Sequence, residues 1–188
     1  MTTSIDIANR ALILLGGREI TSFIDGSNES KIAKSLYQST RDYVLRAYPW
    51  ASLKKRVELV ELLEPPISGY SHQYQIPNDS VRVISVLTPN GDVKQWEVNG
   101  QLVLTDAKPI SIVYLSNTVA EQQYSSQLVQ ALVYRLAAEA SYAMTGSSQA
   151  QQNFNALFEN VLDEARTTDA LEQSSHRIGP SNFERIRL

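Results

Sequence analysis

Residues 15–59 read LGGREITSFIDGSNESKIAKSLYQSTRDYVLRAYPWASLKKRVEL and contain the change of periodicity that decides the fold. A long helix is predicted between Asn28, a candidate N-cap, and Pro49, which cannot continue a helix. Its apolar stripe consists of Ile32, Leu36, Thr40, Val44 and Ala47. From Trp50 onward the apolar residues recur with a period of two, which indicates strands. The chain therefore changes from helical to strand-rich near residue 50.

A shorter amphipathic helix precedes this stretch. Ser4 is a candidate N-cap, with Asp6 in the first turn, and Gly16-Gly17 ends the helix. Its apolar positions are Ile5, Ala8, Leu12 and Leu15. Two helices are thus expected before residue 50.

Residues 51–119 carry the signals of an antiparallel sheet. Asn90-Gly91 and Asn99-Gly100 lie between β-prone runs, a pattern typical of tight hairpins whose central residues take positive φ. Strands are expected around Val57 and Leu59 and over residues 71–76, 81–87, 93–98, 102–105 and 110–115. The prediction is one antiparallel unit of five or six strands.

Helical periodicity returns near Ser125 and runs to Gly146, after which Ser147 or Ser148 can cap a second helix. That helix is expected to bury Ala150, Phe154, Leu157, Phe158, Val161 and Ala165. Because the connection is short, the two helices should be antiparallel neighbours.

The predicted fold class is α+β. Residues 1–50 and 120–172 form an antiparallel four-helix bundle, residues 51–119 form an inserted antiparallel β domain, and residues 173–188 form an extended C-terminal arm. The arm is predicted because QSSHRIGPSNFERIRL shows no apolar period.

The net charge of −3 conceals segments of opposite sign. Residues 1–60 carry +3, residues 61–119 carry −3, residues 120–172 carry −5 and residues 173–188 carry +2. The first residues do not resemble a signal peptide, and no apolar run approaches the roughly 20 residues that cross a bilayer. We expect a soluble protein that is made and used without secretion and contacts no membrane.

The composition removes several classes of chemistry. With no cysteine, the sequence excludes disulfides, Cys-ligated metal centres and thiol nucleophiles. A triad of His72, Asp79 and a serine can be drawn, but no G-x-S-x-G elbow is present, and a half-exposed strand histidine is the simpler interpretation. The other histidine, His176, lies in the arm. The sequence predicts no enzyme, no catalytic residue, no cofactor and no metal site.

Basic residues offer one alternative function. Lys34 and Arg41 flank Gln38 on the second helix, and Lys54, Lys55 and Arg56 follow soon after. Such a patch can neutralise nucleic-acid phosphates without reading sequence. The isoelectric point near 5.4 and the lack of a reading motif count against it. A sequence-independent DNA-binding accessory protein remains the alternative, and a hydrolase that uses His72 is a third class.

Several strings occur together in an order that resembles a known family. In residues 15–59 they are Leu15-Gly16, Ile20, Ser22, Asp25-Gly26, Tyr37, Arg41, Asp42, Leu45 and Pro49-Trp50. Further matches are Tyr74 to Pro77, Asp79, Arg82-Val83, GQLVLTD at 100–106, 112–115, ALVYRLAAEAS at 131–141 and 165–172. This set resembles tail tubular protein A, the head-to-tail adaptor of short-tailed phages. Ile76 in place of leucine and Ala51-Ser52 after the Pro-Trp pair depart from the family pattern.

The resemblance implies a structural protein without chemistry of its own. Members of the family form a ring, usually dodecameric, between the portal protein and the tail nozzle, and DNA passes through the central channel without sequence-specific binding. The resemblance places the protein in the virion, at the head-tail junction, after assembly in the host cytoplasm. It also implies that the helical part stacks on neighbouring subunits, that the β part faces the tail and that the arm reaches the portal.

Two sets of contact residues follow as hypotheses. Neighbouring subunits of a ring meet through unlike surfaces, so the basic Lys34 and Arg41 are expected to meet the acidic Glu159 and Asp163 of the next subunit. The arm is expected to bind the portal through Arg177, Ile178, Phe183, Arg185, Ile186, Arg187 and Leu188. A frayed terminus without a function is the alternative for the arm.

Overall fold

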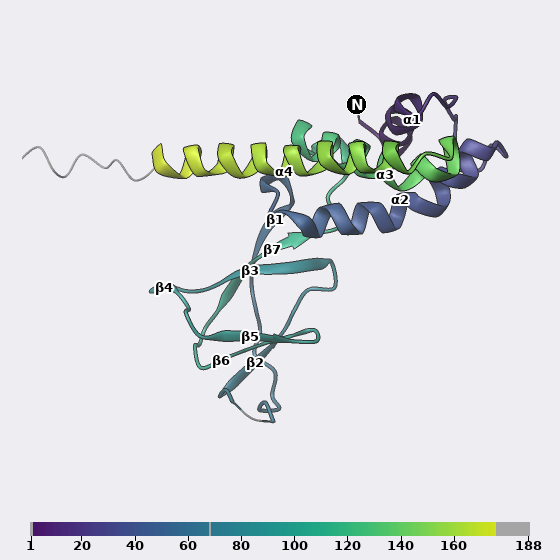
Figure 1. The fold of residues 1–188 in the computed structure, drawn as a ribbon. Coiled ribbons are helices and arrows are strands. Elements are labelled where there is room, and N and C mark those ends of the chain that lie inside the picture. The colour runs from purple at the N-terminus through teal and green to yellow at the C-terminus, as the bar shows by residue number, and fades with distance from the viewer. Residues whose placement is uncertain (1, 68, 176–188) are drawn as a thin grey trace, which may run out of the picture.

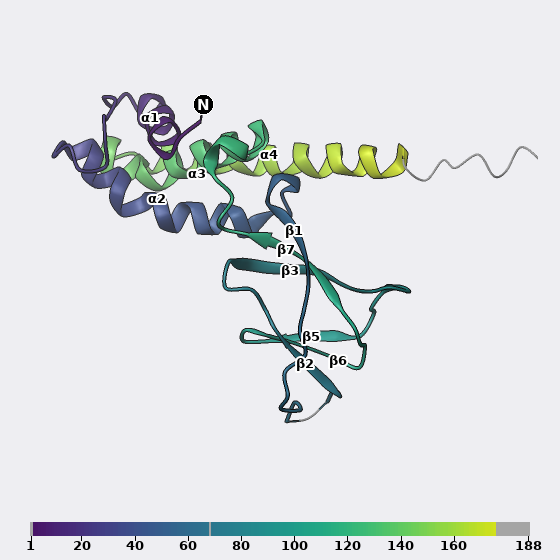
Figure 2. The same ribbon diagram turned by 180° about the vertical axis from the view of Figure 1, so that it is seen from behind.

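The computed structural model describes residues 2–67 and 69–175. These residues contain four α-helices and seven strands. Figure 1 shows the helices gathered in one body and the strands in a β unit that projects from it. The chain enters the β unit through β1 and returns to the helices through β7, and the view from behind in Figure 2 shows the same two connections.

The first two helices begin one residue earlier than a cap at Ser4 or Asn28 would allow. α1 (Ser4–Leu14) is capped by Thr3, whose hydroxyl accepts from the Asp6 amide while the Asp6 carboxylate accepts from the Thr3 amide. α2 (Asn28–Ala47) is capped by Ser27. The predicted caps at Ser4 and Asn28 are therefore wrong by one residue, because in each case the preceding hydroxyl is the one that reaches the amide of the third helical residue.

The last two helices begin at caps that the sequence predicted. α3 (Ser126–Thr145) is capped by Ser125 and ends at Gly146, which has φ 67°. Ser147 caps α4 (Ser148–Ser175) through the Ala150 amide. α4 continues for three residues into the stretch predicted as an extended arm, so that boundary is wrong. The arm residues from 176 onward lie outside the described residues.

The buried face of α4 differs from the predicted one at several positions, and Ala150 and Phe154 are only half-buried. Leu157 is 39% exposed, whereas Leu162 is 4% exposed. In a helix, residues 158, 161, 162 and 165 share one stripe, and Leu157 falls at its edge. The prediction that Leu157 is buried is wrong.

The four helices do not form the predicted four-helix bundle. α3 packs against α4, α2 and α1, so one helix is surrounded by the other three. With 11 residues, α1 is about 16 Å long, against about 42 Å for the 28 residues of α4. A four-helix bundle needs four helices of similar length around a shared axis. α1 is too short to be the fourth helix of such a bundle. The fold is therefore an α+β arrangement of four helices and two antiparallel sheets.

The β unit contains two sheets instead of one. The strands are β1 (Lys54–Glu58), β2 (His72–Gln75), β3 (Ser80–Thr88), β4 (Gly91–Asp92), β5 (Trp96–Asn99), β6 (Leu102–Thr105) and β7 (Ser111–Ser116). One sheet has the order β1-β7-β3-β4 and the other the order β2-β6-β5, with every pair antiparallel. The prediction of five or six strands in one unit is therefore wrong.

Both predicted hairpins form, but their tight loops are shifted. Thr88 pairs with Gly91 and Asn99 pairs with Leu102, so the loops are Pro89-Asn90 and Gly100-Gln101. Gly91 and Gly100 have positive φ, and among the described residues no residue other than glycine does. The asparagines therefore precede the left-handed position and do not occupy it.

Two hydrophobic cores hold the fold. The helical core includes Leu53 and Leu115, which lie at the ends of the β unit closest to the helices, and a second core lies between the sheets. Trp50, 2% exposed, donates from Nε1 to the Val44 carbonyl at 2.9 Å and packs edge-on against Tyr48. This contact folds the chain back on the end of α2, and the short 3₁₀ turn Ala51–Leu53 then leads into β1.

Candidate functional site

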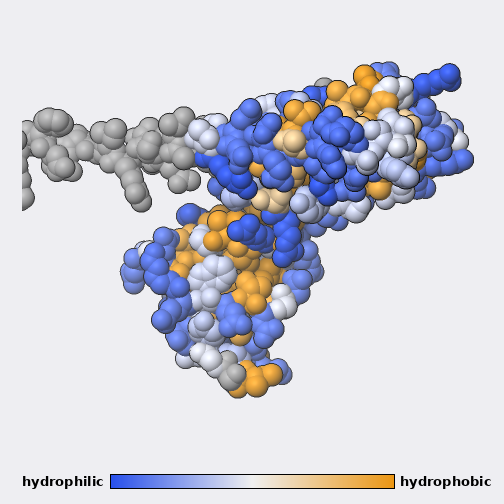
Figure 3. Space-filling model, viewed as in Figure 1, coloured by the Kyte–Doolittle hydropathy of each residue, from blue (hydrophilic) through white to orange (hydrophobic). Residues whose placement is uncertain are grey.

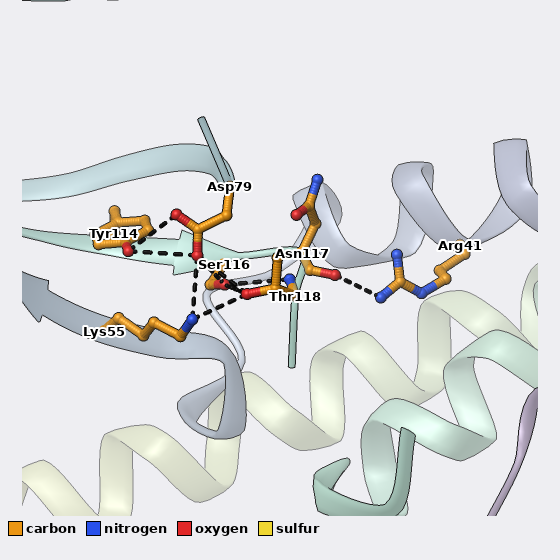
Figure 4. A network of polar contacts seen from close by, with 7 residues as sticks. All are labelled: Arg41, Lys55, Asp79, Tyr114, Ser116, Asn117 and Thr118. Atoms are coloured by element: carbon orange, nitrogen blue, oxygen red, sulfur yellow. Dashed lines mark hydrogen bonds and ion pairs between the residues drawn. The ribbon is translucent and has the colours of Figure 1, made fainter. Parts of the chain in front are cut away.

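A cluster of polar side chains lies at the end of the β unit that is closest to the helices (Figure 4). Asp79, immediately before β3, accepts hydrogen bonds from four side chains, and Figure 4 shows these contacts converging on its carboxylate. The distances are 2.6 Å from the Ser116 hydroxyl, 3.1 Å from Lys55 Nζ, 3.1 Å from the Thr118 hydroxyl and 3.1 Å from the Tyr114 hydroxyl. β1, β3, β7 and the segment after β7 are thereby tied at one point. We name this cluster the Asp79 junction.

The electrostatics of the junction favour a charged carboxylate. Partial burial raises the pKa of Asp79, but the hydrogen bonds from Ser116, Lys55, Tyr114 and Thr118 outweigh burial and lower the pKa from 3.8 to about 2. For Tyr114, burial and the Asp79 carboxylate both raise the hydroxyl pKa, so this group remains a donor. The junction is therefore a fully ionised contact at neutral pH.

Arg41 extends the junction to α2. Its Nη2 donates to the Asn117 carbonyl at 2.7 Å, as Figure 4 shows, and its Nε donates to the Tyr124 hydroxyl at 3.0 Å. The side chain is only 11% exposed, and its Nε lies 3.9 Å from a Glu121 carboxylate oxygen. Arg41, predicted as a subunit contact, thus uses two of its three side-chain nitrogens for hydrogen bonds within its own chain. No local sequence signal indicates this role, because the partners are 76 and 83 residues away.

Lys34 lies about two turns from Arg41 on the same flank of α2, where it is exposed. A pocket of about 400 Å³ opens there. It is lined by Ser4, Phe23, Lys34, Tyr37, Gln38, Arg41 and Glu121, and we name it the Tyr37 pocket. Sequence reasoning found its two cations but not the pocket, which depends on residues brought in from α1 and from the turn Glu121–Gln123.

The Tyr37 side chain is 8% exposed, and its hydroxyl has no hydrogen-bond partner among the described residues. Burial is the largest cause that raises its pKa, and the nearby Glu121 raises it further. The group is therefore a neutral hydroxyl throughout the physiological range. Phe23 packs against the Tyr37 ring with centroids 5.3 Å apart, which fixes the ring in place.

The two predicted acidic contacts lie on the outer surface of α4. Asp163 is exposed and pairs with Arg166 at 2.6 Å, one turn away. Glu159 is exposed and lines a groove between α2 and α4 together with Tyr43, Arg46, Ala47, Leu162 and Arg166. The structure does not bring Glu159 or Asp163 close to Lys34 or Arg41 within one chain. A pairing of these two sets therefore requires a second copy.

His72 lies in β2 and contacts a different acid from the one considered in the triad. Its Nδ1 is 2.6 Å from a Glu61 carboxylate oxygen, and Glu61 also pairs with Lys108. Hydrogen bonds from Lys108 and His72 lower the pKa of Glu61. Since Asp79 is bound at the junction, the triad of His72 and Asp79 does not form. His176 and the seven predicted portal contacts (Arg177, Ile178, Phe183, Arg185, Ile186, Arg187 and Leu188) lie outside the described residues.

Residues 2–67 and 69–175 contain neither a clustered set of metal ligands nor a membrane-spanning helix. No group of three histidine, aspartate or glutamate side chains in these ranges is arranged to hold a metal ion. In the same ranges, no helix has both the length and the apolar character needed to cross a membrane. In comparisons with family models and with curated protein sequences, nothing matches this chain.

Proposed function

We propose that this protein is a structural adaptor of a phage virion, which forms a ring between the portal and the tail nozzle and leaves a central channel for DNA. The observation that carries the proposal is the arrangement of the chain in two parts with different surfaces. One part is a helical body with unlike flanks, and the other is a β unit that projects from it (Figure 1). The ordered resemblance of residues 1–172 to tail tubular protein A supports the same function.

The flanks of the helical body suit a ring. A heterologous interface joins two different surfaces of identical subunits and closes when the rotation between subunits divides a full turn. The Tyr37 pocket on one flank contains Lys34, Arg41 and Glu121, and the α2–α4 groove on the other contains Arg46, Glu159 and Arg166. The two flanks thus present different side chains, as a heterologous interface requires.

The far end of the β unit suits a second partner. The segment between β1 and β2 lies at this end in Figures 1 and 2, and Figure 3 shows apolar side chains there. In this segment Val60 is 85% exposed, and Leu63 and Ile67 are fully exposed. Exposed aliphatic groups that lie together mark interaction sites. We assign this end to the tail side of the adaptor, as the resemblance implies.

The alternative of a DNA-binding accessory protein receives less support from the placement of the cations. Arg41 and Lys55 form internal contacts at the Asp79 junction. Only Lys34, Lys54 and Arg56 of the basic patch remain exposed without such a contact among the described residues. Three cations dispersed over a helix and a strand can neutralise few phosphates of a DNA duplex, so they would bind DNA weakly.

Electron microscopy of the purified protein, alone and after mixing with portal rings, tests the proposed function. We expect closed rings with an axial hole, alone or seated on the portal. Particles that remain monomeric under both conditions would contradict the proposal. DNA binding in a salt titration separates the alternative, because phosphate neutralisation gives an affinity that falls steeply with salt.

A further inference from the structure

The outer edge of β1 has no strand beside it among the described residues. β7 pairs with β1 on one side, and β1 is the outermost strand of the order β1-β7-β3-β4. Because the Leu59 amide donates to the Ile110 carbonyl at 3.0 Å, Leu59 and every second residue before it direct their backbone groups towards β7. The backbone N–H and C=O groups of Arg56 and Glu58 therefore point away from the sheet, where another strand can pair with them.

The side chains along this edge are charged and available. Lys54, Arg56 and Glu58 are exposed, and none of them forms an ion pair with another described residue. All three lie on one face of β1, because side chains alternate between the two faces of a strand. Arg56 and Glu58 also line a pocket of about 350 Å³, whose other lining residues are Leu87, Thr88, Pro89, Pro109, Ile110 and Ser111. A partner therefore meets cations, an anion and a partly apolar hollow side by side.

The order of charges along β1 fits a second copy of the same strand in one antiparallel register. When the pairing is centred on Val57, Arg56 lies opposite the partner's Glu58 and Glu58 lies opposite the partner's Arg56. Lys54 then faces the partner's Val60, whose side chain is 85% exposed and uncharged. Every other antiparallel register that pairs two of the three charged residues puts at least one pair of like charges opposite each other, which is destabilising. The charges therefore select both the partner and the register.

We propose that β1 pairs antiparallel with β1 of a second copy of this chain, with Arg56 opposite the partner's Glu58. Each of the two Arg56–Glu58 pairs exchanges two backbone hydrogen bonds and brings opposite charges together on the same face of the extended sheet. The partner's Arg56 lies on the pocket side of Glu58, so its aliphatic stem covers the apolar lining of the pocket. The contact has a twofold axis at Val57 and closes with two copies.

This inference goes beyond the proposed ring. Neighbours in a ring are related by rotation about a single axis and meet through unlike surfaces, so a ring contains no twofold contact between neighbours. The dimer is therefore a form of the free protein. In it the unpaired backbone groups of β1 are covered and cannot template the addition of other strands.

Charge reversal tests the register by sedimentation equilibrium of the full chain, for which we expect a reversible monomer–dimer equilibrium. R56E and E58R should each weaken dimerisation by about tenfold, because each turns two opposite-charge pairs into two like-charge pairs. R56E/E58R exchanges the two charges and should recover dimerisation to within about threefold of wild type. K54E makes the same charge change on the same strand and should dimerise like wild type, since Lys54 faces no charge of the partner. All three positions are exposed, so the Tm of the monomer should be unchanged.

Amide hydrogen exchange of the wild-type chain tests the backbone contacts. The Arg56 and Glu58 amides should exchange more slowly at a protein concentration where the dimer prevails than after dilution to monomer. The Leu59 amide, which bonds Ile110 within the chain, is the control and should exchange at the same slow rate under both conditions. Exchange of Arg56 and Glu58 that does not depend on concentration would mean that no second copy pairs with this edge.

The cysteine-free sequence permits a direct test of proximity. On the twofold axis the two Val57 residues form a non-hydrogen-bonded pair with Cα atoms about 4.5 Å apart, a separation that a disulfide can span. Oxidised V57C should therefore form covalent dimers, whereas K54C, two residue pairs from its own copy's position, should form few.

Wild type that stays monomeric, or a dimer that R56E and E58R leave unchanged, would overturn the proposal. Protection of the Glu58 amide that appears only after addition of portal rings would assign the edge to a different protein and would also overturn it. Neither result would affect the adaptor ring, which is tested separately by electron microscopy. Dimers without rings would in turn contradict the adaptor function and support the pairing of β1.

Discussion

Replacing Asp79 with asparagine removes one negative charge from the junction between the helices and the β unit. Asparagine keeps the shape of the side chain and one acceptor oxygen, so the main loss is the charge that Lys55, Ser116 and Thr118 stabilise. The variant resembles a permanently protonated Asp79. The pKa of Asp79 therefore gives the size of the effect.

A decrease of the pKa from 3.8 to about 2 corresponds to about 2 kcal/mol in favour of the charged, folded form, at 1.36 kcal/mol per unit. We expect D79N to lower the free energy of unfolding by about this amount at pH 7. For a chain of 188 residues, such a loss lowers the Tm by about 4–8 °C. Urea titrations and thermal scans measure both quantities.

The pH dependence has a defined sign. Because the folded pKa lies below the unfolded one, the stabilisation is complete above pH 3.8 and is lost as the pH falls towards 2. The difference between wild type and D79N should therefore decrease to about half at pH 3. D92N, an exposed aspartate in β4, is the control. A D79N deficit equal to that of D92N, or one that stays constant between pH 7 and pH 3, would refute the reasoning.

Four further substitutions have expected outcomes in the same urea titration. T3A removes the cap of α1 and should cost about 1 kcal/mol, whereas T2A should cost little; equal costs would contradict the capping box. G146A places a Cβ at φ 67° and should cost about 1 kcal/mol; a neutral result would contradict the left-handed cap. F158A empties a site that is 1% exposed and should cost about 3–5 kcal/mol, with less than 1 kcal/mol contradicting its place in the core. H72Q alters a partly exposed pair with Glu61 and should stay within about 0.5 kcal/mol of wild type, and assembly should also be unchanged.

Local signals in the sequence predicted the elements well and their edges less well. Gly146 and Ser147 mark the boundary between α3 and α4 because a left-handed cap and a side-chain cap depend only on neighbouring residues. At Thr3 and Ser27 two adjacent residues were both capable of capping, and only the backbone geometry selected one. The helices could therefore be predicted, but their first residues could not.

Contacts over long sequence separations were not predictable from patterns. Periodicity showed which face of each helix is apolar, but not that α3 would be surrounded by the other three helices. The two-sheet arrangement depends on the order in which β7 inserts between β1 and β3, which strand signals do not encode. The Asp79 junction joins residues that are 24 to 39 positions apart, so no local sequence pattern indicates it.

The basic patch shows why charge runs are poor guides to a surface. Of its five cations, Lys55 binds Asp79 and Arg41 binds Asn117 and Tyr124, so two are structural. Spacing along a helix gives the flank of a cation but not the acceptors that another part of the chain brings to it. Nε and Nη2 of Arg41 are therefore already hydrogen-bonded within the chain. If Arg41 contacts an acidic side chain of another subunit, Nη1 is the nitrogen that can make the contact.

The Arg41 side chain consequently has two roles, one in the fold and one at the Tyr37 pocket. Through Nε and Nη2 it fixes the segment between β7 and α3, and so it helps to orient the β unit on the helices. Arg41 also lines the Tyr37 pocket, and its Nη1 lies 3.9 Å from an Asp42 carboxylate oxygen. Because guanidinium is planar and rigid, the position of Nη1 follows from the two bonds that hold the rest of the group. A subunit contact made there would therefore be formed on a group already positioned by the fold, and a lysine at this position would keep the charge but lose that coupling.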